Sequence, residues 1–367
     1  MPTPPLNSPG RHLPFNSYCL SPAFNGGRDS VHLSDSNSTM SNPSSSVWSR
    51  RRFLQTTVAA SAFAMGLAAC GSRKTDTVRL GWGLGGLPML AKVRGEFEKT
   101  LAKDNVKVEW IGPFPNHAPS LAAVTGGSAD FSFGGSTTPA LAAMIAGSPL
   151  VFTQFCVVDP RSTAIIAMDG SGIDRVEDLV GKTVAVNRSG LGEFLLVAAL
   201  EKHKVPRDAV NIVYLNPPDA APAFSQGKID AWSMWSPGVD IARANYKGHN
   251  IFLEGRDLDF QIDFNSYVTT RKFAEDNADL VKAVNAAYGQ EAKWASENSL
   301  EAETIAQQQG HYSDEVRNTL SSMKRKFNMH GVGDKAFVQD LQKAADWLAA
   351  RSVLPQKINV PDYLAKV

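Results

Sequence analysis

The sequence lacks the hallmarks of nucleic-acid-binding, disulfide-rich and polytopic membrane proteins. Its 367 residues include 3 Cys, and 37 Lys and Arg residues nearly balance 36 Asp and Glu residues. Because it has no long Lys/Arg run, it lacks the charged footprint of a nucleic-acid-binding protein, and we expect no nucleic-acid partner. Its uncharged stretch at residues 56–69 is too short to span a bilayer as a helix.

The first 69 residues differ in composition from the rest of the chain. Residues 1–49 contain no Lys and are rich in Ser and Asn, a composition that predicts a disordered leader. Arginines at positions 50–52 precede the uncharged stretch, as in a signal peptide. Followed by Phe53 and Leu54, they resemble a twin-arginine export signal. Met1 and Met40 both remain candidate start residues.

The stretch ends in Leu67-Ala68-Ala69-Cys70, which resembles a lipobox, the cleavage site that precedes a lipid-modified cysteine. Cys70 is therefore the predicted lipidation site. Cys19 would be removed with the leader, which leaves Cys156 without a disulfide partner. Because Cys156 lies in an apolar run, we expect a buried structural thiol.

From residue 78 onward, short β-branched or aromatic runs alternate with helical patterns, which predicts an α/β fold on mainly parallel sheets. The expected strands are 78–82, 106–111, 130–133, 151–157, 164–168, 184–187, 212–215, 229–234, 251–254 and 266–270. The expected helices between them include 88–103, 139–146, 193–202 and 220–226. After residue 271 we expect helices at 278–298, 299–309, 313–327 and 335–351, with Ser313 and Asp334 as N-terminal caps.

A glycine-rich loop follows the first expected strand. Gly81-Trp82-Gly83-Leu84-Gly85-Gly86 matches G-x-G-x-x-G, the pattern of dinucleotide-binding loops. The acid on the next strand, Glu109, stands in mid-strand rather than at the strand end where a ribose would lie. We therefore interpret this segment as a flexible loop on the rim of another kind of pocket.

Two polar turns each lie between an expected strand and an expected helix. The first is Gly134-Gly135-Ser136-Thr137-Thr138-Pro139, and the second is Asn187-Arg188-Ser189-Gly190-Leu191-Gly192. Free N–H groups and hydroxyls at a helix N-terminus favour an anion. Trp235, after a third strand, would reach the same cleft. His117 opens a helix, where we favour a surface or cap position over the cleft. The histidines are scattered, and motifs of metallohydrolases and serine hydrolases are missing.

Taken together, motifs along the chain resemble those of the solute-binding proteins of ATP-driven importers for aliphatic sulfonates, taurine and nitrate. The resemblance covers nearly all of residues 77–365. It rests on Val78-Arg79-Leu80-Gly81, Phe114-Pro115, Gly127-Ser128-Ala129-Asp130-Phe131, Thr138-Pro139, residues 176–187 and 195–200, Asp230-Ala231-Trp232, Trp235-Ser236-Pro237, and Ala344-Ala345-Asp346-Trp347-Leu348.

The resemblance implies a bilobal periplasmic-binding-protein fold of type II, with the ligand held in a cleft between two α/β lobes. Residues 70–163 plus 267–367 would form lobe 1 and residues 164–266 lobe 2, joined by strands near Ala164 and Ser266. Closure of the lobes would present the ligand to a membrane permease and its ATPase. The implied protein is a monomeric, periplasmic, lipid-anchored binding protein without a cofactor, a metal or an enzymatic activity.

The same resemblance implies a set of ligand-binding residues. They are Leu84, Gly85, Gly86, Leu87, Ser136, Thr137, Thr138, Asn187, Ser189, Gly190 and Trp235. Many sulfonate-binding relatives carry an acid at the position of Thr137 and an Asp at that of Ser236, and both positions are uncharged here. We therefore expect a small organosulfonate or related oxyanion rather than taurine, whose ammonium group those acids would favour.

Two alternatives belong to other functional classes. Pyrimidine-forming enzymes of thiamine biosynthesis share this fold, so the fold alone does not exclude catalysis. They are cytosolic, and the export signal argues against such a role. The second alternative is a sensor that reports the ligand to a membrane kinase. Neighbouring genes for a permease and an ATPase would favour the importer.

Overall fold

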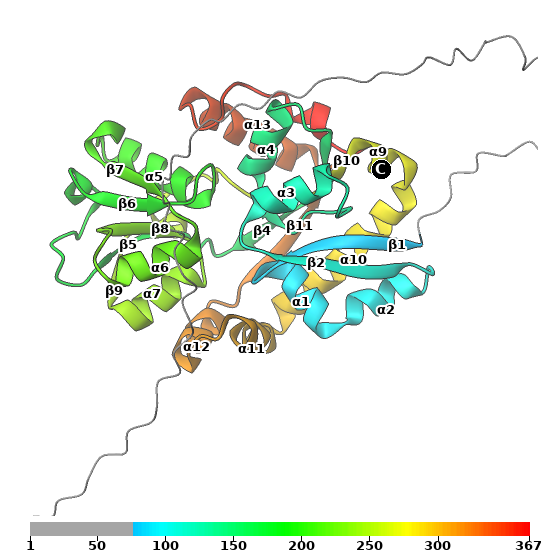
Figure 1. Ribbon diagram of the computed structural model, residues 1–367, viewed down its shortest axis with the longest axis horizontal. Coiled ribbons are helices and arrows are strands. Elements are labelled where there is room, and N and C mark those ends of the chain that lie inside the picture. Colours follow the sequence, from blue (N-terminus) through cyan, green and yellow to red (C-terminus); the bar gives the residue numbers. More distant parts are fainter. Residues whose placement is uncertain (1–75) are drawn as a thin grey trace, which may run out of the picture. The chain divides into compact units, whose positions relative to one another are not determined.

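Runs of β-branched and aromatic residues form two separate sheet systems in residues 76–367, the part of the chain that the computed structural model describes (Figure 1). The leader, the export signal and Cys70 lie outside these residues. The two sheet systems, each with its own helices, confirm the prediction of two α/β halves.

The first half contains a two-stranded and a four-stranded sheet. In the smaller sheet, β1 (Thr77–Gly83) pairs in parallel with β2 (Lys107–Phe114). The larger sheet has the order β11 (Lys326–Gly331), β4 (Leu150–Asp159), β10 (Asn265–Thr270) and β3 (Gly135–Ser136). The backbone N–H of Gly81 donates to the carbonyl oxygen of Phe131 at 2.8 Å, which continues β1 toward the larger sheet.

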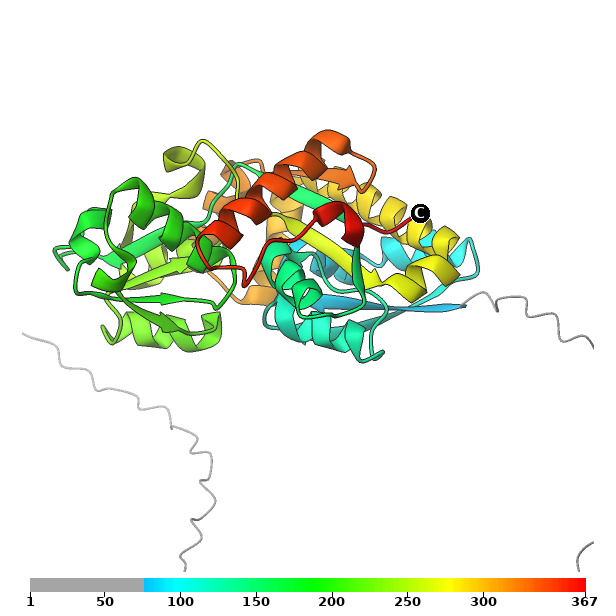
Figure 2. The same cartoon turned by 90° about the horizontal axis from the view of Figure 1, so that it is seen from above.

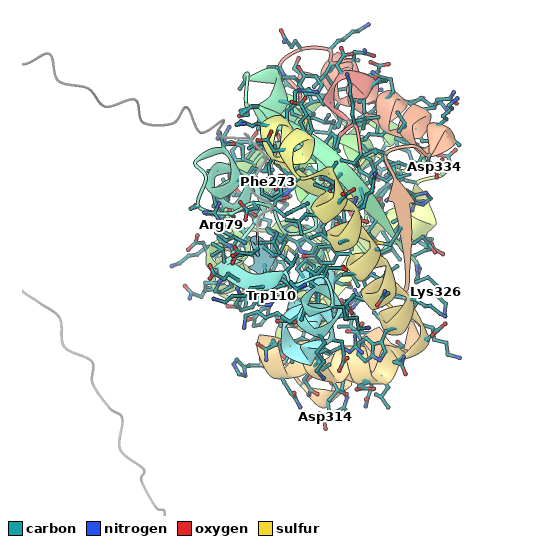
Figure 3. The ribbon with its side chains drawn as sticks, turned by 90° about the vertical axis from the view of Figure 1, so that its right-hand side faces the viewer. Arg79, Trp110, Phe273, Asp314, Lys326 and Asp334 are labelled. Carbon is teal, nitrogen blue, oxygen red and sulfur yellow. The ribbon has the colours of Figure 1, made fainter. Side chains whose placement is uncertain are left out.

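Nine helices accompany these sheets in the described residues. They are α1 (Gly86–Arg94), α2 (Glu96–Ala102), α3 (His117–Thr125), α4 (Thr137–Ile145), α9 (Arg271–Asp276), α10 (Ala278–Glu297), α11 (Ser299–Gly310), α12 (Asp314–Ser322) and α13 (Lys335–Ala350). Figure 3 shows α10 crossing one face of this half beside β11, which begins at Lys326. There the Lys326 ammonium donates to the Ser296 carbonyl oxygen at 2.8 Å, which joins the strand to the helix.

The second half contains one five-stranded sheet. Its order is β7 (Asn211–Tyr214), β6 (Thr183–Val186), β8 (Ala231–Met234), β5 (Ala164–Met168) and β9 (Gly248–Leu253). Its helices are α5 (Leu191–Lys202), α6 (Pro217–Ser225), α7 (Gly238–Tyr246) and α8 (Glu254–Asp257). Strand β6 is parallel to both β7 and β8, so the turns after these strands lie at one end of the sheet.

The expectation of mainly parallel sheets is wrong. Strand β4 is antiparallel to β10 and β11, and β5 is antiparallel to β8 and β9. For β4 with β10 and for β5 with β9, the reason is the path of the chain, which leaves the first half along β4 and returns along β10. In the second half it enters along β5 and leaves along β9. Outgoing and returning strands that lie side by side necessarily run in opposite directions.

Three of the predicted elements also need correction. The expected strand at 130–133 makes only an isolated bridge, between Phe131 and Leu80. The expected helix at 88–103 is interrupted at Gly95, whose φ of 69° is left-handed. The expected helix at 313–327 ends at Ser322, because Lys324 has a φ of 49° and the chain then enters β11. Helix α7 was not predicted.

Two segments, 160–163 and 254–264, link the halves. The Arg161 guanidinium lies on the first and donates to carbonyl oxygens on the second, at 2.6 Å to Leu258 and 2.5 Å to Phe260. The two links are therefore tied to each other. Helix α13 adds a further contact, because Arg351 at its end is paired with Glu201 of α5; Figure 2 shows α13 extending toward the second half.

The interior agrees with a structural role for Cys156. Its side chain is buried, and burial raises the pKa of its thiol to about 12. The thiol is therefore protonated and unreactive at neutral pH, as expected. Within residues 76–367, each helix is too short or too polar to cross a membrane.

Candidate functional site

The first polar turn is fixed by His117. This side chain is buried, and its Nδ1 lies 2.7 Å from the carbonyl oxygen of Ser136 while its Nε2 lies 3.0 Å from Ser132 Oγ. A Cβ on Gly135 would lie 2.5 Å from His117 Cγ, so the turn needs glycine to approach the ring. Burial lowers the pKa of His117 to about 4, and the ring is neutral at pH 7.

The expectation that His117 lies at the surface or caps the helix is wrong. The cap of α3 is Asn116, whose Oδ1 accepts a hydrogen bond from the Ala118 N–H at 3.2 Å. His117 is instead a buried support of the turn at Ser136. The sequence placed it correctly at the start of a helix but gave no sign of its partners, which come from residues 15 and 19 positions away.

Thr137 and Thr138, at the start of α4, donate to an internal carboxyl group. Asp263 Oδ1 accepts from Thr137 Oγ1 at 2.7 Å, from the Thr138 N–H at 3.1 Å and from Thr138 Oγ1 at 3.1 Å. Both threonines are fully buried. The prediction that their hydroxyls are free for a ligand is therefore wrong, because each hydroxyl proton is already shared with Asp263.

Asp263 also places an acid beside this turn, which the sequence predicted to be free of negative charge. Burial raises the pKa of its carboxyl group, and the hydrogen bonds from Thr137 and Thr138 oppose that rise. An acid thus contacts Thr137, although position 137 itself is uncharged. The sequence did not reveal it, because Asp263 lies 126 residues away on the link that returns to the first half.

The second polar turn follows β6 and folds around Asn187. The Asn187 Oδ1 accepts from the Gly192 N–H at 3.2 Å. A Cβ on Gly190 would lie 1.5 Å from Asn187 Nδ2, so only glycine leaves this side chain in place. Ser189 has a φ of 50°, and its N–H donates to Glu193 Oε2 at 2.7 Å.

Glu193, in the first turn of α5, is a second acid that sequence reasoning missed. Its buried carboxyl accepts from Arg207 Nη2 at 2.6 Å and from the Tyr214 hydroxyl at 3.0 Å through Oε1. Acids in the first helical turn complement the helix dipole, which was the only available signal. An internal carboxyl group therefore accepts hydrogen bonds at the N-terminus of each of the two helices, α4 and α5.

The glycine loop separates its predicted site residues. Leu84 is 57% exposed, whereas Leu87 is 2% exposed and packs in the core of the first half. Gly86 has a φ of 75°, which requires glycine as the chain enters α1. Gly85 precedes the helix in an extended conformation. Leu84, Gly85 and Gly86 stay available to a ligand, while a contact with the Leu87 side chain lacks support.

Trp235 directly follows β8 and is half-buried. It packs at the edge of an apolar cluster of the second half that includes the buried Trp232. The peptide bond between Ser236 and Pro237 is cis, and α7 begins at Gly238. Trp235 thus follows β8 at the end of the sheet where Asn187 follows β6, because the two strands are parallel.

A hydrogen bond joins the two halves beside both polar turns. The Asn116 Nδ2 donates to the Asn216 Oδ1 at 2.9 Å. On one side, Asn116 precedes His117, which contacts Ser136. On the other side, the Leu215 N–H donates to the Val186 carbonyl oxygen at 3.0 Å, next to Asn187. A continuous series of contacts therefore runs from Ser136 in the first half, through the bond between Asn116 and Asn216, to the second polar turn. No hydrogen bond among residues 76–367 joins Leu84 or Trp235 to it.

The arrangement offers polar groups but no metal centre. Within the described range 76–367, no three His, Cys, Asp or Glu side chains are placed to hold a metal ion. The polar groups available to a ligand are those of the turns at Ser136 and at residues 187–190. Such groups can hold a small polar molecule by hydrogen bonds.

Curated relatives agree with this architecture. A protein of Escherichia coli named for binding aliphatic sulfonates is 27% identical over 295 residues, which cover 80% of this chain and 90% of the relative. A protein of Bacillus subtilis with the same name is 27% identical over 308 residues, which cover 81% of this chain and 90% of the relative.

Solved structures show the same fold, and a sequence profile shows the family. The aliphatic sulphonate binding protein SsuA from Escherichia coli has a TM-score of 0.69 at 24% identity and covers 79% of this chain and 92% of its own. The nitrate-binding protein NrtA from Synechocystis has a TM-score of 0.62 at 14% identity and covers 80% and 86%. The profile described as NMT1/THI5 like matches residues 91–302. The chain belongs to the NMT1/THI5-like family.

Proposed function

We propose that this protein is the substrate-binding component of an ABC importer that captures a small organosulfonate or related oxyanion between its two halves. The observation that supports the proposal most is the hydrogen bond between Asn116 and Asn216, because Asn116 adjoins His117, which contacts Ser136, and Asn216 follows Leu215, which is bonded next to Asn187. The names of the curated relatives support the ligand class. The ligand would then be presented to the permease and its ATPase.

Within this proposal, the ligand contacts Ser136, Asn187, Ser189, Gly190 and Trp235. The exposed Leu84 with Gly85 and Gly86 would contact its carbon chain. Thr137, Thr138 and Leu87 would shape the site from behind, because they are buried. Charge-assisted hydrogen bonds to the oxyanion would contribute about 1.5 to 3 kcal/mol each before desolvation.

We propose binding rather than catalysis. The fold also occurs in an enzyme, since the desulfurization enzyme DszB has a TM-score of 0.58 at 15% identity over 79% of this chain and 96% of its own. A cysteine nucleophile lacks support here, because burial raises the pKa of the Cys156 thiol to about 12. The pKa of His117 is lowered to about 4, and both ring nitrogens contact protein oxygens.

We further propose export and lipid anchoring at Cys70, with the monomeric mature protein in the periplasm. The lobes would comprise residues 70–163 plus 267–367 and residues 164–266, although β10 already pairs with β4 and β3 of the first half from Asn265 onward. The signal at positions 50–70 supports this location, and Cys70→Ala tests it. The variant should leave the membrane fraction and lose its acyl group, whereas a variant that is still acylated would contradict the anchor.

The ligand class can be tested by thermal unfolding of the purified protein with alkanesulfonates, taurine, sulfate, nitrate and a pyrimidine. A ligand at a hundred times its Kd adds about 2.7 kcal/mol, and each kcal/mol raises the Tm of a chain of this size by about 2 °C. A shift with sulfonates supports the proposal. A shift with the pyrimidine and none with any anion would refute it and favour the enzyme-like alternative.

A further inference from the structure

Arg188 is an exposed cation in the middle of the second polar turn. Its neighbours Asn187, Ser189 and Gly190 were predicted to contact the ligand, whereas Arg188 was not. Within residues 76–367 its guanidinium forms no ion pair. Its Cζ instead lies 3.7 Å from the centre of the Tyr214 ring. Stacking on a ring orients a guanidinium but leaves its charge uncompensated.

The other arginine beside this turn is already paired. Arg207 Nη2 lies 2.6 Å from Glu193 Oε1, and the Tyr214 hydroxyl donates to the same carboxylate oxygen at 3.0 Å. The Tyr214 ring is thus held by Glu193 through its hydroxyl, while its face carries Arg188. The two arginines therefore differ in their pairing. Arg207 neutralises the buried carboxylate of Glu193, whereas the charge of Arg188 can pair with a ligand.

The two helix starts at this junction offer an anion little positive charge. The start of α4 is occupied by Asp263, and the Ser189 N–H before α5 is occupied by Glu193, so neither helix end offers its full dipole to a ligand. His117, on the other side of the junction, is neutral at pH 7, because burial lowers its pKa to about 4. Arg188 supplies the positive charge that these groups lack.

Arg188 also stands where the halves meet. It stacks on Tyr214 at the end of β7, and two residues later Asn216 accepts the hydrogen bond from Asn116 of the other half at 2.9 Å. A guanidinium offers several N–H donors in a planar fork that matches two oxygens of an oxyanion. We propose that Arg188 is the charge partner of the bound oxyanion and selects for negatively charged ligands. This inference rests on the proposed function.

Calorimetric titration of the purified protein with ethanesulfonate, at several NaCl concentrations, tests the role of Arg188. The variant Arg188→Gln should raise the Kd at least tenfold and flatten the salt dependence of binding. Arg188→Lys, which keeps the charge but loses the planar fork, should lie in between. Lys228→Gln is the matched control, because it removes one exposed positive charge before β8, at the opposite end of that strand from Trp235.

The outcomes separate the two proposals. If wild-type protein binds ethanesulfonate and Arg188→Gln binds within twofold of it at every salt concentration, the role of Arg188 is refuted and the proposed function stands. If wild-type protein binds neither ethanesulfonate nor sulfate, nitrate or any other anion tested, the proposed function fails and this inference fails with it. Because Arg188 is exposed, its variants should keep the wild-type Tm, which shows that a lost affinity is not a lost fold.

Discussion

Asn116 and Asn216 are 100 residues apart in sequence, yet the Nδ2 of the first lies 2.9 Å from the Oδ1 of the second. Asn116 caps α3 through its own Oδ1, and Asn216 directly precedes α6. The side chain of Asn116 therefore accepts a hydrogen bond within its own half through Oδ1 and donates one to the other half through Nδ2. This bond joins the starts of two helices at the proposed ligand site.

Removing the bond from the Asn216 side should weaken ligand binding without unfolding the protein. In Asn216→Ala the cap of α3 stays intact, because that bond uses Asn116 Oδ1. An exposed hydrogen bond contributes about 0.5 to 1.5 kcal/mol. We expect the Kd for ethanesulfonate to rise about two- to tenfold, with a nearly unchanged Tm. Gln226→Ala, at the other end of α6, is the control, and equal affinities for both variants would contradict the role of the bond.

Asp263→Ala should destabilise the protein. The substitution leaves two hydroxyls and one N–H, from Thr137 and Thr138, without their buried acceptor. Each unsatisfied buried group costs about 1 to 3 kcal/mol, and we expect a total loss of about 3 kcal/mol after local relaxation. Urea unfolding measures this loss. Asp263→Asn keeps one acceptor oxygen and should lose less, so equal stabilities of Asp263→Ala and wild type would refute the assignment.

Gly190→Ala should abolish the geometry of the second turn. Its Cβ would lie 1.5 Å from Asn187 Nδ2, and the asparagine must leave its position. We expect at least a tenfold loss of affinity for ethanesulfonate in calorimetric titration. Gly289→Ala is the control, because a Cβ at that position in α10 meets nothing within 4 Å. Wild-type affinity in Gly190→Ala would show that Asn187 does not hold the ligand.

Glu254 should make stability depend on pH. It begins α8 on the returning link, and burial raises its pKa to about 7, although Arg161 opposes this with Nη1 at 3.7 Å from Oε1. Because its folded pKa exceeds the unfolded value of 4.5, its contribution is complete below pH 4.5 and is lost as the pH rises to about 7. A pKa shift of this size corresponds to about 3 kcal/mol in the free energy of unfolding.

His117 has the opposite effect and must be separated from Glu254. Its pKa falls from 6.5 to about 4, so its contribution is present above pH 6.5 and is lost as the pH falls to about 4. The contributions of Glu254 and His117 to the unfolding free energy change over the same pH range in opposite directions, so they partly cancel in the wild type. Unfolding free energies of Glu254→Gln between pH 4.5 and 7 should therefore rise more steeply with pH than those of the wild type. Parallel curves would contradict the raised pKa of Glu254.

Local signals in the sequence predicted the elements of the fold well. The apolar run around Cys156 predicted β4, and Ser313 and Asp334 cap α12 and α13 as expected, accepting from the Val316 and Phe337 N–H groups. These features depend on neighbours within a few residues. The strand directions were wrong because they depend on where the chain crosses between halves, which local periodicity does not encode.

The site was predictable only in part, for the same reason. The second polar turn lies between a strand and a helix as expected, whereas the first comprises the short strand β3 and the start of α4 and follows no strand at 130–133. Their partners were missed, because Asp263 meets Thr137 across 126 residues and Tyr214 meets Glu193 across 21. A free hydroxyl and a hydroxyl bound to a buried acid look identical in sequence.

The most direct test of the central claim is calorimetric titration of ethanesulfonate into wild-type protein and into Asn187→Ala. We predict one ligand per chain for the wild type and at least a tenfold weaker affinity for the variant, whose Tm in the absence of ligand should fall by only about 2 °C because it loses the hydrogen bond from the Gly192 N–H. Wild-type protein that binds no sulfonate, sulfate or nitrate, or a variant that binds ethanesulfonate as tightly as wild type, would contradict an oxyanion site at the junction of the two halves.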